Sequence, residues 1–476
     1  MKGFVYSFCF LVFLSGCAVG PDYQRPELQL PEQWPPTVAT SATPTTDTST
    51  HWWQRFKDPI LTGLIDRAIA DNLSLRLQLE RIQEARARLG LASAQRLPSL
   101  DAQAEASRRQ QSAAVSTGQL ANSFSVMGLL NYEIDLWGRL ARGEESATAQ
   151  LEASRYSHDA LQLRVISDLV TTYINLRAAQ QQLNITESTL ASRYDSLQLQ
   201  QIRYDGGLID QLALQQARSE WEATRALLPR QQEQVLLLES ALAVLTGMSP
   251  AELMSRFDFG ERRLTDLHLF RERPAFLPSD LIERRPDIQA AQAALVAANA
   301  QVGVATAERL PRFNLAMFIG SVAGEFDDLL GSSSESWGVS GSLLAPVVDF
   351  GRNKARRQTA EALRDQAETS YRMAVQTAFR EVRDALLLTR TTEERENAIR
   401  RQLESAEKTL SLVQVRYEEG YSSFIEVLDA QRQLLGAELA LTEAVRDRYT
   451  ATAALANALG GGWSGAAGSD SAGEGL

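Results

Sequence analysis

The sequence predicts a mainly α-helical protein with a smaller β component, built from an internal duplication, and three observations support this fold class. One sequence offset relates the two halves of the chain, because Arg96-Leu97-Pro98 recurs 213 residues later as Arg309-Leu310-Pro311. Each half has a long stretch in which apolar residues stand three, four or seven apart, the spacing of packed long helices. Each half also has two short segments in which apolar and polar residues alternate, the pattern of strands with one apolar face.

The composition argues against several function classes. The 476 residues carry a net charge of -11, whereas a nucleic-acid-binding protein needs a basic face to neutralise phosphates. His51, His158 and His268 lie far apart, and the expected mature chain has no cysteine pair, so we expect no His/Cys metal site. The sequence shows no nucleophile motif, phosphate-binding loop or metal cluster, so we expect neither an enzyme nor a bound cofactor.

The N-terminus predicts a lipoprotein. Residues 1–16 have the features of a signal peptide, with Lys2, an apolar run from Phe4 to Leu14, and then small residues. The run ends in Leu14-Ser15-Gly16-Cys17, the lipobox pattern, which predicts a diacylglycerol and an acyl chain on Cys17. The alternative is an ordinary secretory signal with an incidental cysteine. Ala18 follows the cysteine, which resembles the lipoproteins that are sorted to the outer membrane.

The rest of the chain divides into five segments. The residues that follow the lipobox are rich in Pro and Thr and predict an extended, lipidated tether, since this composition forms neither a helix nor a core. The last residues are rich in Gly, Ser and Ala, which predicts a disordered tail. The predicted segments are the tether (17–59), the first repeat (60–247), a linker (248–272), the second repeat (273–460) and the tail (461–476).

Each repeat begins with a helix that is followed by two strands. The helix is predicted over Leu61–Gln95 and, in the second repeat, over Pro286–Leu310, and each ends before Pro98 or Pro311. Alternation then places every second residue of the strands on one apolar face. The predicted apolar positions are Leu100, Ala102, Ala104, Ala106, Phe124, Val126, Gly128, Leu130 and Tyr132, and in the second repeat Phe313, Leu315, Met317, Ile319, Trp337, Val339, Gly341, Leu343 and Ala345.

Each repeat continues with a long helix that reverses at a turn containing Gly207 or Gly420. In the first repeat the heptad spacing runs from Arg139 to Tyr204, which is about 66 residues and roughly 100 Å if the helix is continuous. A second helix returns from each turn. Pro229 is expected to kink or divide the first of these returning helices.

The strands imply an oligomer if they enter a membrane. Their length and alternation are typical of outer-membrane barrel strands, with apolar side chains toward lipid. Four strands cannot close a barrel, and lipid does not tolerate an open sheet edge. Two copies of the chain would supply eight strands and three copies would supply twelve. The alternative is a soluble hairpin or the edge of a sandwich.

These features together resemble a known family. The residues that carry the resemblance are Cys17-Ala18-Val19-Gly20-Pro21-Asp22-Tyr23 after the lipobox, Arg284-Arg285-Pro286-Asp287-Ile288, the duplicated strand pairs, and Val427-Leu428-Asp429-Ala430-Gln431. They are similar to the TolC-type outer-membrane factors, and in particular to their OprM/NodT-like efflux lipoproteins. The resemblance implies a homotrimer in which a twelve-stranded transmembrane β-barrel continues into a long periplasmic α-helical barrel. It also implies two partners, a periplasmic adaptor and an inner-membrane pump, usually of the resistance-nodulation-division type.

The resemblance further implies that helix pairs close the periplasmic end of the channel. The matching gate positions are Ile425, Glu426 and Asp429, and Tyr417 is a candidate for a hydrogen bond that locks the gate. Ile425 and Asp429 lie four residues apart and share a helix face, so three copies would form an apolar ring beside an acidic ring. The alternative is that both acids are solvated charges near a helix N-terminus.

The resemblance makes Gly207 and Gly420 the expected docking tips for the adaptor, because glycine exposes the backbone there. It implies a passive exit duct for drugs or other small molecules, lipid-anchored in the bacterial outer membrane and extending into the periplasm. One alternative is a non-conducting periplasmic scaffold or adaptor lipoprotein, which leaves the duplicated amphipathic strands unexplained. Another is a type I secretion duct. Drug, fatty-acid and heavy-metal efflux all fit, so the sequence predicts no substrate and no particular pump.

Overall fold

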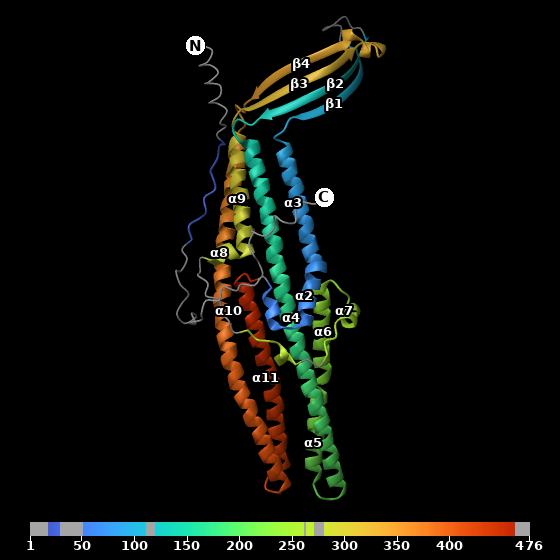
Figure 1. Ribbon diagram of the computed structural model, residues 1–476, viewed down its shortest axis with the longest axis vertical. Helices are drawn as coiled ribbons and strands as arrows, with labels where there is room; N and C mark the ends of the chain where they lie inside the picture. The colour runs from blue at the N-terminus through green and yellow to red at the C-terminus, as the bar shows by residue number, and fades with distance from the viewer. Residues whose placement is uncertain (1–17, 29–50, 111–119, 261–262, 271–279, 462–476) are drawn as a thin grey trace. The chain divides into compact units, whose positions relative to one another are not determined.

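The computed structural model describes residues 18–28, 51–110, 120–260, 263–270 and 280–461 (Figure 1). These residues belong to two compact units. Unit 1 comprises Met1–Leu28, Glu80–Tyr156 and Gln289–Met373, and unit 2 comprises Gln29–Leu79, Ser157–Ile288 and Ala374–Leu476. Each unit therefore contains parts of both repeats. The predicted signal peptide, the lipidation site Cys17 and the predicted tail beyond residue 461 lie outside the described residues.

Unit 1 contains a four-stranded antiparallel sheet in the order β1-β2-β3-β4. The strands are β1 (Ser99–Gln110), β2 (Leu120–Ile134), β3 (Arg312–Ala323) and β4 (Glu335–Leu344). Leu130 of β2 lies opposite Leu100 of β1 and opposite Met317 of β3. Because opposite residues share a face, the register confirms the predicted apolar face. Ala345 lies just past β4, since Pro346 has no N–H with which to continue the ladder.

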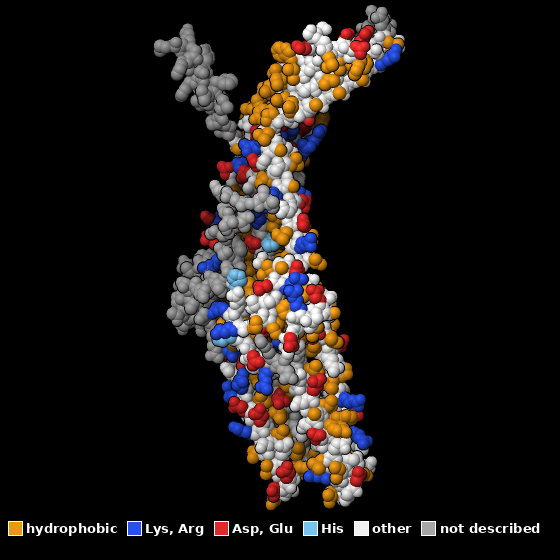
Figure 2. Space-filling model, turned by 45° about the vertical axis from the view of Figure 1, so that its right-hand side comes forward, with side chains coloured by type: hydrophobic (Ala, Val, Ile, Leu, Met, Phe, Trp, Pro, Cys, Tyr) orange, Lys and Arg blue, Asp and Glu red, His pale blue; other side chains and the backbone are white. Residues whose placement is uncertain are grey.

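The apolar face of the sheet is exposed in the single chain. Leu100 is 76 % exposed and Trp337 is 75 % exposed. Figure 2 shows hydrophobic side chains gathered over the strands, whereas charged side chains are spread over the helices. Within the described residues β1 and β4 are the edges of the sheet. An exposed apolar face with two unpaired edges is expected to be covered in the working form of the protein.

Each strand pair follows one helix and leads into another. The helix α3 (Leu73–Ala94) precedes β1 and α9 (Pro286–Ala307) precedes β3, while α4 (Arg139–Asp205) follows β2 and α10 (Arg352–Glu418) follows β4. The turn after β4 contains Asp349, whose carboxylate accepts two backbone N–H groups at the start of α10. Such contacts satisfy the free donors of a helix N-terminus. The contacts of Asp349 therefore fix the turn between β4 and α10.

The segment 18–28 is fixed against other residues of unit 1. Asp22 forms an ion pair with Arg142, with 2.6 Å between the oxygen and nitrogen. Gly20 has a φ of +106°, and a Cβ at this position would lie 2.5 Å from the Cα of Gly303, so only glycine fits. The segment has neither helix nor strand, as its composition predicts. Its specific contacts were not predicted.

Unit 2 has an apolar core that includes residues of the predicted tether and of the predicted linker. The tether was predicted to extend to residue 59, but Trp52 and Phe56 are at most 4 % exposed and belong to this core. Large aromatic side chains bury much apolar area, which outweighs the composition of the preceding residues. The predicted linker 248–272 also contributes Leu253 and Leu264, both fully buried. The other helices are η1 (Trp52–Phe56), α2 (Pro59–Asp71), α5 (Gln211–Arg225), α6 (Leu228–Thr246), α7 (Pro250–Arg256), η2 (Leu264–Asp266), α8 (Asp280–Arg284) and α11 (Phe424–Ala458).

The helix that was predicted over Leu61–Gln95 is in fact two helices, α2 and α3, which are separated at Asn72. The Asn72 backbone is extended, with φ -62° and ψ 122°. Its side-chain oxygen accepts the N–H groups of Ser74 and Leu75, which caps α3. The sequence prediction was wrong here because the apolar spacing continues across the cap.

The remaining helix predictions are confirmed. The long helix α4 ends one residue after the predicted position, and the heptad residues Leu169 and Leu176 are fully buried. Pro229 divides the first returning helix, since α5 ends at Arg225 and α6 begins at Leu228. Among the described residues, no single helix has the length and apolar character of a membrane span. One bent pair, Gln211–Thr246 with Pro250–Arg256, meets that criterion only when the two are taken together.

Candidate functional site at the hairpin tips

Both helical hairpins of unit 2 turn through the same backbone motif. In the first hairpin the Gly207 N–H donates to the Tyr204 carbonyl at 2.9 Å, and the Leu208 N–H donates to the Arg203 carbonyl at 2.8 Å. The equivalent two bonds at Gly420 measure 3.1 and 2.7 Å. Both glycines have a positive φ, 69° and 82°, as this Schellman motif favours. The predicted turns therefore lie where the glycines indicate.

Glu426 lies in the first turn of α11 and makes a local contact. Its Oε1 accepts the Ser423 N–H at 3.2 Å and the Ser423 hydroxyl at 3.1 Å. These hydrogen bonds lower the pKa of Glu426 below its ordinary value. They also satisfy a free donor at the helix start, which agrees with the alternative hypothesis for this acid. In the first hairpin Asp210 caps α5 by accepting the Ala213 N–H at 3.0 Å.

Ile425 and Asp429 are more exposed, and they lie on one face of α11. The Ile425 residue is 43 % exposed and the Asp429 side chain is 60 % exposed. Asp429 Oδ2 accepts a hydrogen bond from Gln433 at 3.0 Å, and Asp429 Oδ1 lies 3.7 Å from Arg432 Nη1. In the single chain Asp429 therefore keeps a carboxylate at the surface, next to one arginine of its own helix.

Tyr417 joins the second hairpin to the first. Its hydroxyl accepts hydrogen bonds from Arg203 at 3.1 Å and from Gln200 at 3.4 Å, and both donors lie on α4. The Arg203 guanidinium carbon lies 5.7 Å from the Tyr417 ring centroid, within the range of a cation–π contact. The ring also packs against Phe424, with 5.6 Å between centroids. The predicted hydrogen bonding of Tyr417 is present, while its role in a gate stays a prediction.

Glu220 on α5 makes a second link between the hairpins. One carboxylate oxygen lies 2.7 Å from Arg432 Nη2 on α11, and the other lies 3.1 Å from Arg193 Nη1 on α4. The side chains of Glu220 and Arg193 are only 13 % and 6 % exposed. Burial lowers the pKa of Arg193, whereas the hydrogen bond to Glu220 raises the pKa of Arg432. A carboxylate held between two guanidinium groups is a strong, directional contact.

An apolar cluster lies beside these polar contacts and draws on both hairpins. Its buried members are Leu197, Leu214, Ala217, Phe424, Val427 and Leu428. We call two polar contacts the hairpin latch: Tyr417 with Arg203 and Gln200, and Glu220 with Arg432. The cluster holds the hairpins together without directional preference, whereas the latch depends on specific atoms.

Tyr417 was predicted from the sequence, whereas Arg203, Glu220 and Arg432 were not. The separation along the chain is 212 residues for Glu220 and Arg432, 214 for Arg203 and Tyr417, and 217 for Gln200 and Tyr417. These values are close to the repeat offset of 213. Nearly equivalent positions of the two repeats therefore lie side by side in unit 2. Opposite charges at nearly equivalent positions are the signal that could have identified the Glu220–Arg432 contact.

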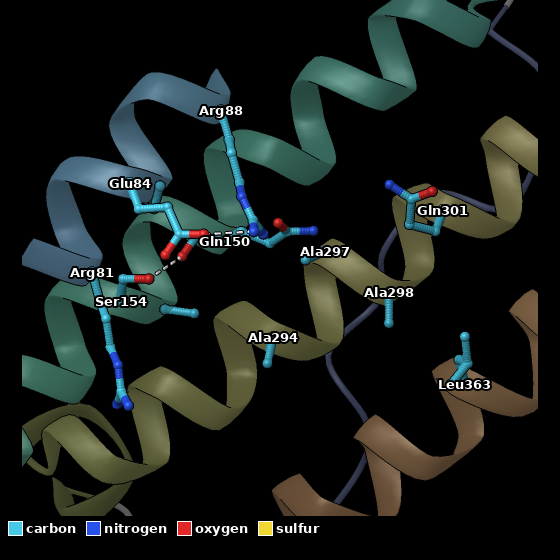
Figure 3. Close-up of a pocket in the computed structure, with 12 residues that line it drawn as sticks. Arg81, Glu84, Arg88, Gln150, Ser154, Ala294, Ala297, Ala298, Gln301 and Leu363 are labelled. Carbon is cyan, nitrogen blue, oxygen red and sulfur yellow. Dashed lines mark hydrogen bonds and ion pairs between the residues drawn. The ribbon is translucent and has the colours of Figure 1, made fainter. Parts of the chain in front are cut away.

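Unit 1 contains an open cavity of about 610 Å³ among α3, α4, α9 and α10 (Figure 3). Arg88 and Glu84 on its wall form an ion pair at 2.6 Å, and Ala294, Ala297 and Ala298 of α9 form a small-residue side. The Ser154 hydroxyl in this lining donates a hydrogen bond to the Gln150 carbonyl of its own helix at 3.0 Å. In the described part of the chain, no three His, Cys, Asp or Glu side chains are grouped so that they could hold a metal ion.

Two ranges of the chain, residues 64–248 and 277–461, match the model of one protein family, described as outer membrane efflux protein. The chain belongs to the outer membrane efflux protein family. The two ranges begin 213 residues apart, which is the offset of the internal duplication. The family predicted from the resemblance is confirmed, and with it the efflux function at the outer membrane. A non-conducting scaffold is therefore not supported.

Curated relatives match over nearly the whole chain. Outer membrane protein OprJ of Pseudomonas aeruginosa is 35 % identical, with 94 % of each chain covered. The solvent efflux pump outer membrane protein SrpC of Pseudomonas putida is 32 % identical, over 95 % of this chain and 97 % of SrpC. The cation efflux system protein CusC of Escherichia coli is 31 % identical, over 96 % of this chain and 98 % of CusC.

Solved structures of outer-membrane channels have the same fold. The structure of the OprN channel is 32 % identical and covers 94 % of this chain and 100 % of OprN, with a TM-score of 0.88. The MtrE channel of Neisseria gonorrhoeae, described as an open state, is 27 % identical over 94 % of this chain and 98 % of MtrE, with a TM-score of 0.84. The predicted mainly helical fold class is confirmed, as is the location of the protein at the outer membrane and in the periplasm.

Proposed function

We propose that three copies of the chain form a passive exit duct in a tripartite efflux system, closed at the periplasmic end by their hairpin tips. The observation that carries this proposal is the exposed apolar face of the sheet with unpaired edges at β1 and β4. A free edge is not tolerated in lipid, so the strands have to pair between chains. Three copies supply twelve strands, an even number within the range of outer-membrane barrels. The duct has no catalytic activity of its own.

The N-terminus anchors the duct to the membrane, and the hairpin tips bind its partner. Cys17 carries the lipid, and the described residues that follow it are bound to unit 1, because Asp22 forms an ion pair with Arg142. The hairpin tips at Gly207 and Gly420 bind the periplasmic adaptor, and the inner-membrane pump supplies the energy. Exposed apolar residues beside the two turns support this docking, since Leu208 is 78 % and Tyr421 is 77 % exposed.

The relatives point to a duct that does not itself select its cargo. SrpC is named for solvents and CusC for cations, yet their identities to this chain differ by a single percentage point. Selection then belongs to the pump and the adaptor, and the chain contributes passage across the outer membrane. The alternative function for the same fold is that of a type I secretion duct.

Native mass spectrometry of the detergent-extracted protein tests the assembly. We expect three chains, each heavier than residues 17–476 by a diacylglycerol and an acyl group. A lipidated monomer would overturn the exit duct and restore the scaffold hypothesis. A trimer without lipid would keep the duct and show that Cys17 was misinterpreted.

In the proposed gate, the Asp429 side chains of the three copies form an acidic ring at the hairpin tips. Three carboxylates that face one axis repel one another and can hold a cation, which limits passage. Glu426 contributes less to this ring, because Ser423 holds its carboxylate at the start of α11. Ile425, one helical turn away from Asp429, supplies an apolar constriction.

Replacing both acids, Asp429→Ala with Glu426→Ala, is expected to raise the conductance of the purified channel in a planar lipid bilayer. The single change Asp429→Ala should account for most of the increase, since it removes charge from the ring. Glu426→Gln should have a smaller effect, because Gln also functions as the partner in a capping box. Unchanged currents in the double variant would argue against the acidic ring.

A further inference from the structure

Equivalent faces of the two repeats line the cavity of unit 1 (Figure 3). On α3 three lining residues stand three, four and seven positions after Arg81, which places all four on one face of the helix. Four lining residues of α9 have the same spacing, and each lies 213 residues after its α3 counterpart. The duplication therefore supplies the same lining positions twice. The equivalent pairs are Arg81 with Ala294, Glu84 with Ala297, Ala85 with Ala298, Arg88 with Gln301, and, from α4 and α10, Gln150 with Leu363.

The two sets of equivalent positions differ in chemistry. The first repeat contributes the charged residues Arg81, Glu84 and Arg88 from α3. At the same positions α9 has two alanines and a glutamine, and α10 has Leu363 where α4 has Gln150. The chain as a whole has a net charge of -11, yet the charged lining residues are two arginines and one glutamate. A molecule that complements both sides of the cavity has an anionic group and an apolar body.

Two carboxamides between these sides are held by one serine. The fully buried Ser146 of α4 donates its hydroxyl proton to the Ala297 carbonyl at 3.0 Å. The same hydroxyl oxygen accepts hydrogen bonds from Gln301 at 2.8 Å and from Gln150 at 3.3 Å. Both glutamines are exposed and line the cavity, one from α9 and one from α4. Amides that are already held offer oriented hydrogen-bonding groups, and a ligand does not have to order them.

Arg88 is suited to hold the anionic group. Its partner Glu84 lies one turn away on α3 at 2.6 Å, and the two side chains are 65 % and 58 % exposed. An exposed pair of this kind contributes little to stability, so a ligand can compete for the guanidinium. The group has five N–H donors in a planar fork that matches a carboxylate, sulfonate or phosphate. Figure 3 shows Arg88 extending from α3 toward Gln150, over the cavity.

The cavity and the segment 18–28 lie on opposite faces of α9. The Asn299 amide of α9 donates to the Pro21 carbonyl at 2.9 Å, and Gly303 packs against the same segment. At 3.6 residues per turn, Asn299 and Gly303 lie about half a turn around the helix from Ala294. In the proposed duct the segment 18–28 continues from the lipid anchor and lies on the outer surface. The cavity then faces the interior of the duct.

We propose that this cavity binds amphipathic organic anions inside the duct. Arg88 holds the anionic group, and the amides of Gln150 and Gln301 bind polar atoms next to it. The apolar body lies against Ala294 and Leu363. This inference rests on the proposed function and adds a site at which such molecules pause during passage. Cargo of other chemistry passes without binding, so the site does not make the duct selective.

Isothermal titration calorimetry with naphthalene-2-sulfonate tests the site on the full-length protein in phosphatidylcholine nanodiscs, with empty nanodiscs as the background. We expect saturable binding of one molecule per chain. Arg88→Gln should weaken binding about tenfold, the effect of losing a hydrogen bond to a charged group. The compound 2-naphthylmethylammonium has the same apolar body with a positive charge, and it should bind the wild type far more weakly.

Two further variants separate the cavity from the rest of the surface. Ala294→Leu places a larger side chain in the cavity and should weaken binding severalfold, without loss of helix content because Ala294 is exposed. Arg390→Gln is the control, since Arg390 is an exposed arginine of unit 2 that pairs one turn away with Glu394 at 2.9 Å. It should bind like the wild type. Equal binding of the cationic compound, or unchanged affinity in both Arg88→Gln and Ala294→Leu, would overturn the site.

Single-channel recording in a planar bilayer tests whether the site faces the interior of the duct. Naphthalene-2-sulfonate is expected to lower the current as its concentration rises. Arg88→Gln should need about tenfold more of the compound for the same reduction. Calorimetric binding that leaves the current unchanged would overturn the interior position. A single-chain native mass would overturn the duct itself, whereas calorimetry with the cavity variants would still decide whether the site binds the anion.

Discussion

Replacing Tyr417 by Phe together with Arg432 by Gln is expected to raise the conductance of the purified channel severalfold. The two changes remove both polar contacts of the hairpin latch, the hydroxyl that binds Arg203 and the guanidinium that binds Glu220. A coupling between two elements of about 1–3 kcal/mol corresponds to a shift of about 5- to 150-fold in their equilibrium. Single-channel recording in a planar bilayer measures the change as a larger current or a higher open fraction.

The structure supplies a matched control for this experiment. Arg225→Gln removes the same charge from an exposed arginine, but Arg225 pairs with Glu222 of its own helix at 3.7 Å and joins no hairpins. It should leave the conductance unchanged. The phenyl ring of Tyr417→Phe retains the contact with Phe424, so the apolar cluster stays intact. An unchanged current in the double variant would mean that the cluster alone keeps the tips together.

Asp58→Ala is expected to lower the free energy of unfolding by about 3–5 kcal/mol, the range for removing one partner of a buried charged network. Asp58 is 5 % exposed and accepts the Ile60 N–H at the start of α2 and the Tyr173 hydroxyl at 2.8 Å. The Tyr173 oxygen in turn accepts a hydrogen bond from the buried Arg177. Without the carboxylate, the Arg177 charge and the Tyr173 hydroxyl lose their negatively charged neighbour.

Asp58→Asn separates the two roles of this residue. Asn caps a helix about as well as Asp, so the cap of α2 should remain and only the charge is lost. Chemical unfolding followed by the helical circular dichroism signal should place Asn between wild type and Ala. If Asn equals wild type and Ala loses only about 1 kcal/mol, the typical value of a cap, then the buried network contributes nothing.

Most of the secondary structure was predictable because its causes are local. Alternation along β1 to β4 determined which side chains share a face, and Pro229, Gly207 and Gly420 marked a break and two turns. The helix that was predicted wrongly also has a local cause, but the spacing of apolar residues alone does not reveal it. Asn72 caps α3 within a continuous apolar pattern.

The candidate site was only partly predictable. A motif near a glycine turn predicted the gate residues Ile425, Asp429 and Tyr417. Of these, Tyr417 does bind the other hairpin. Glu426 has its own partner in Ser423, a contact that the spacing of a serine and a glutamate three residues apart could have indicated. Glu220 belongs to no motif, and only its position close to the repeat equivalent of Arg432 distinguishes it from the other charges of the helices.

The sequence by itself determined the duplication, the helices and strands, the apolar face and the family, because each depends on periodicity or on similarity along the chain. Only the tertiary structure decided that Arg432 binds Glu220 and that equivalent faces of α3 and α9 line one cavity. These facts depend on which surfaces of two repeats meet. A long helix offers many charges and many faces, and packing against a second element selects among them.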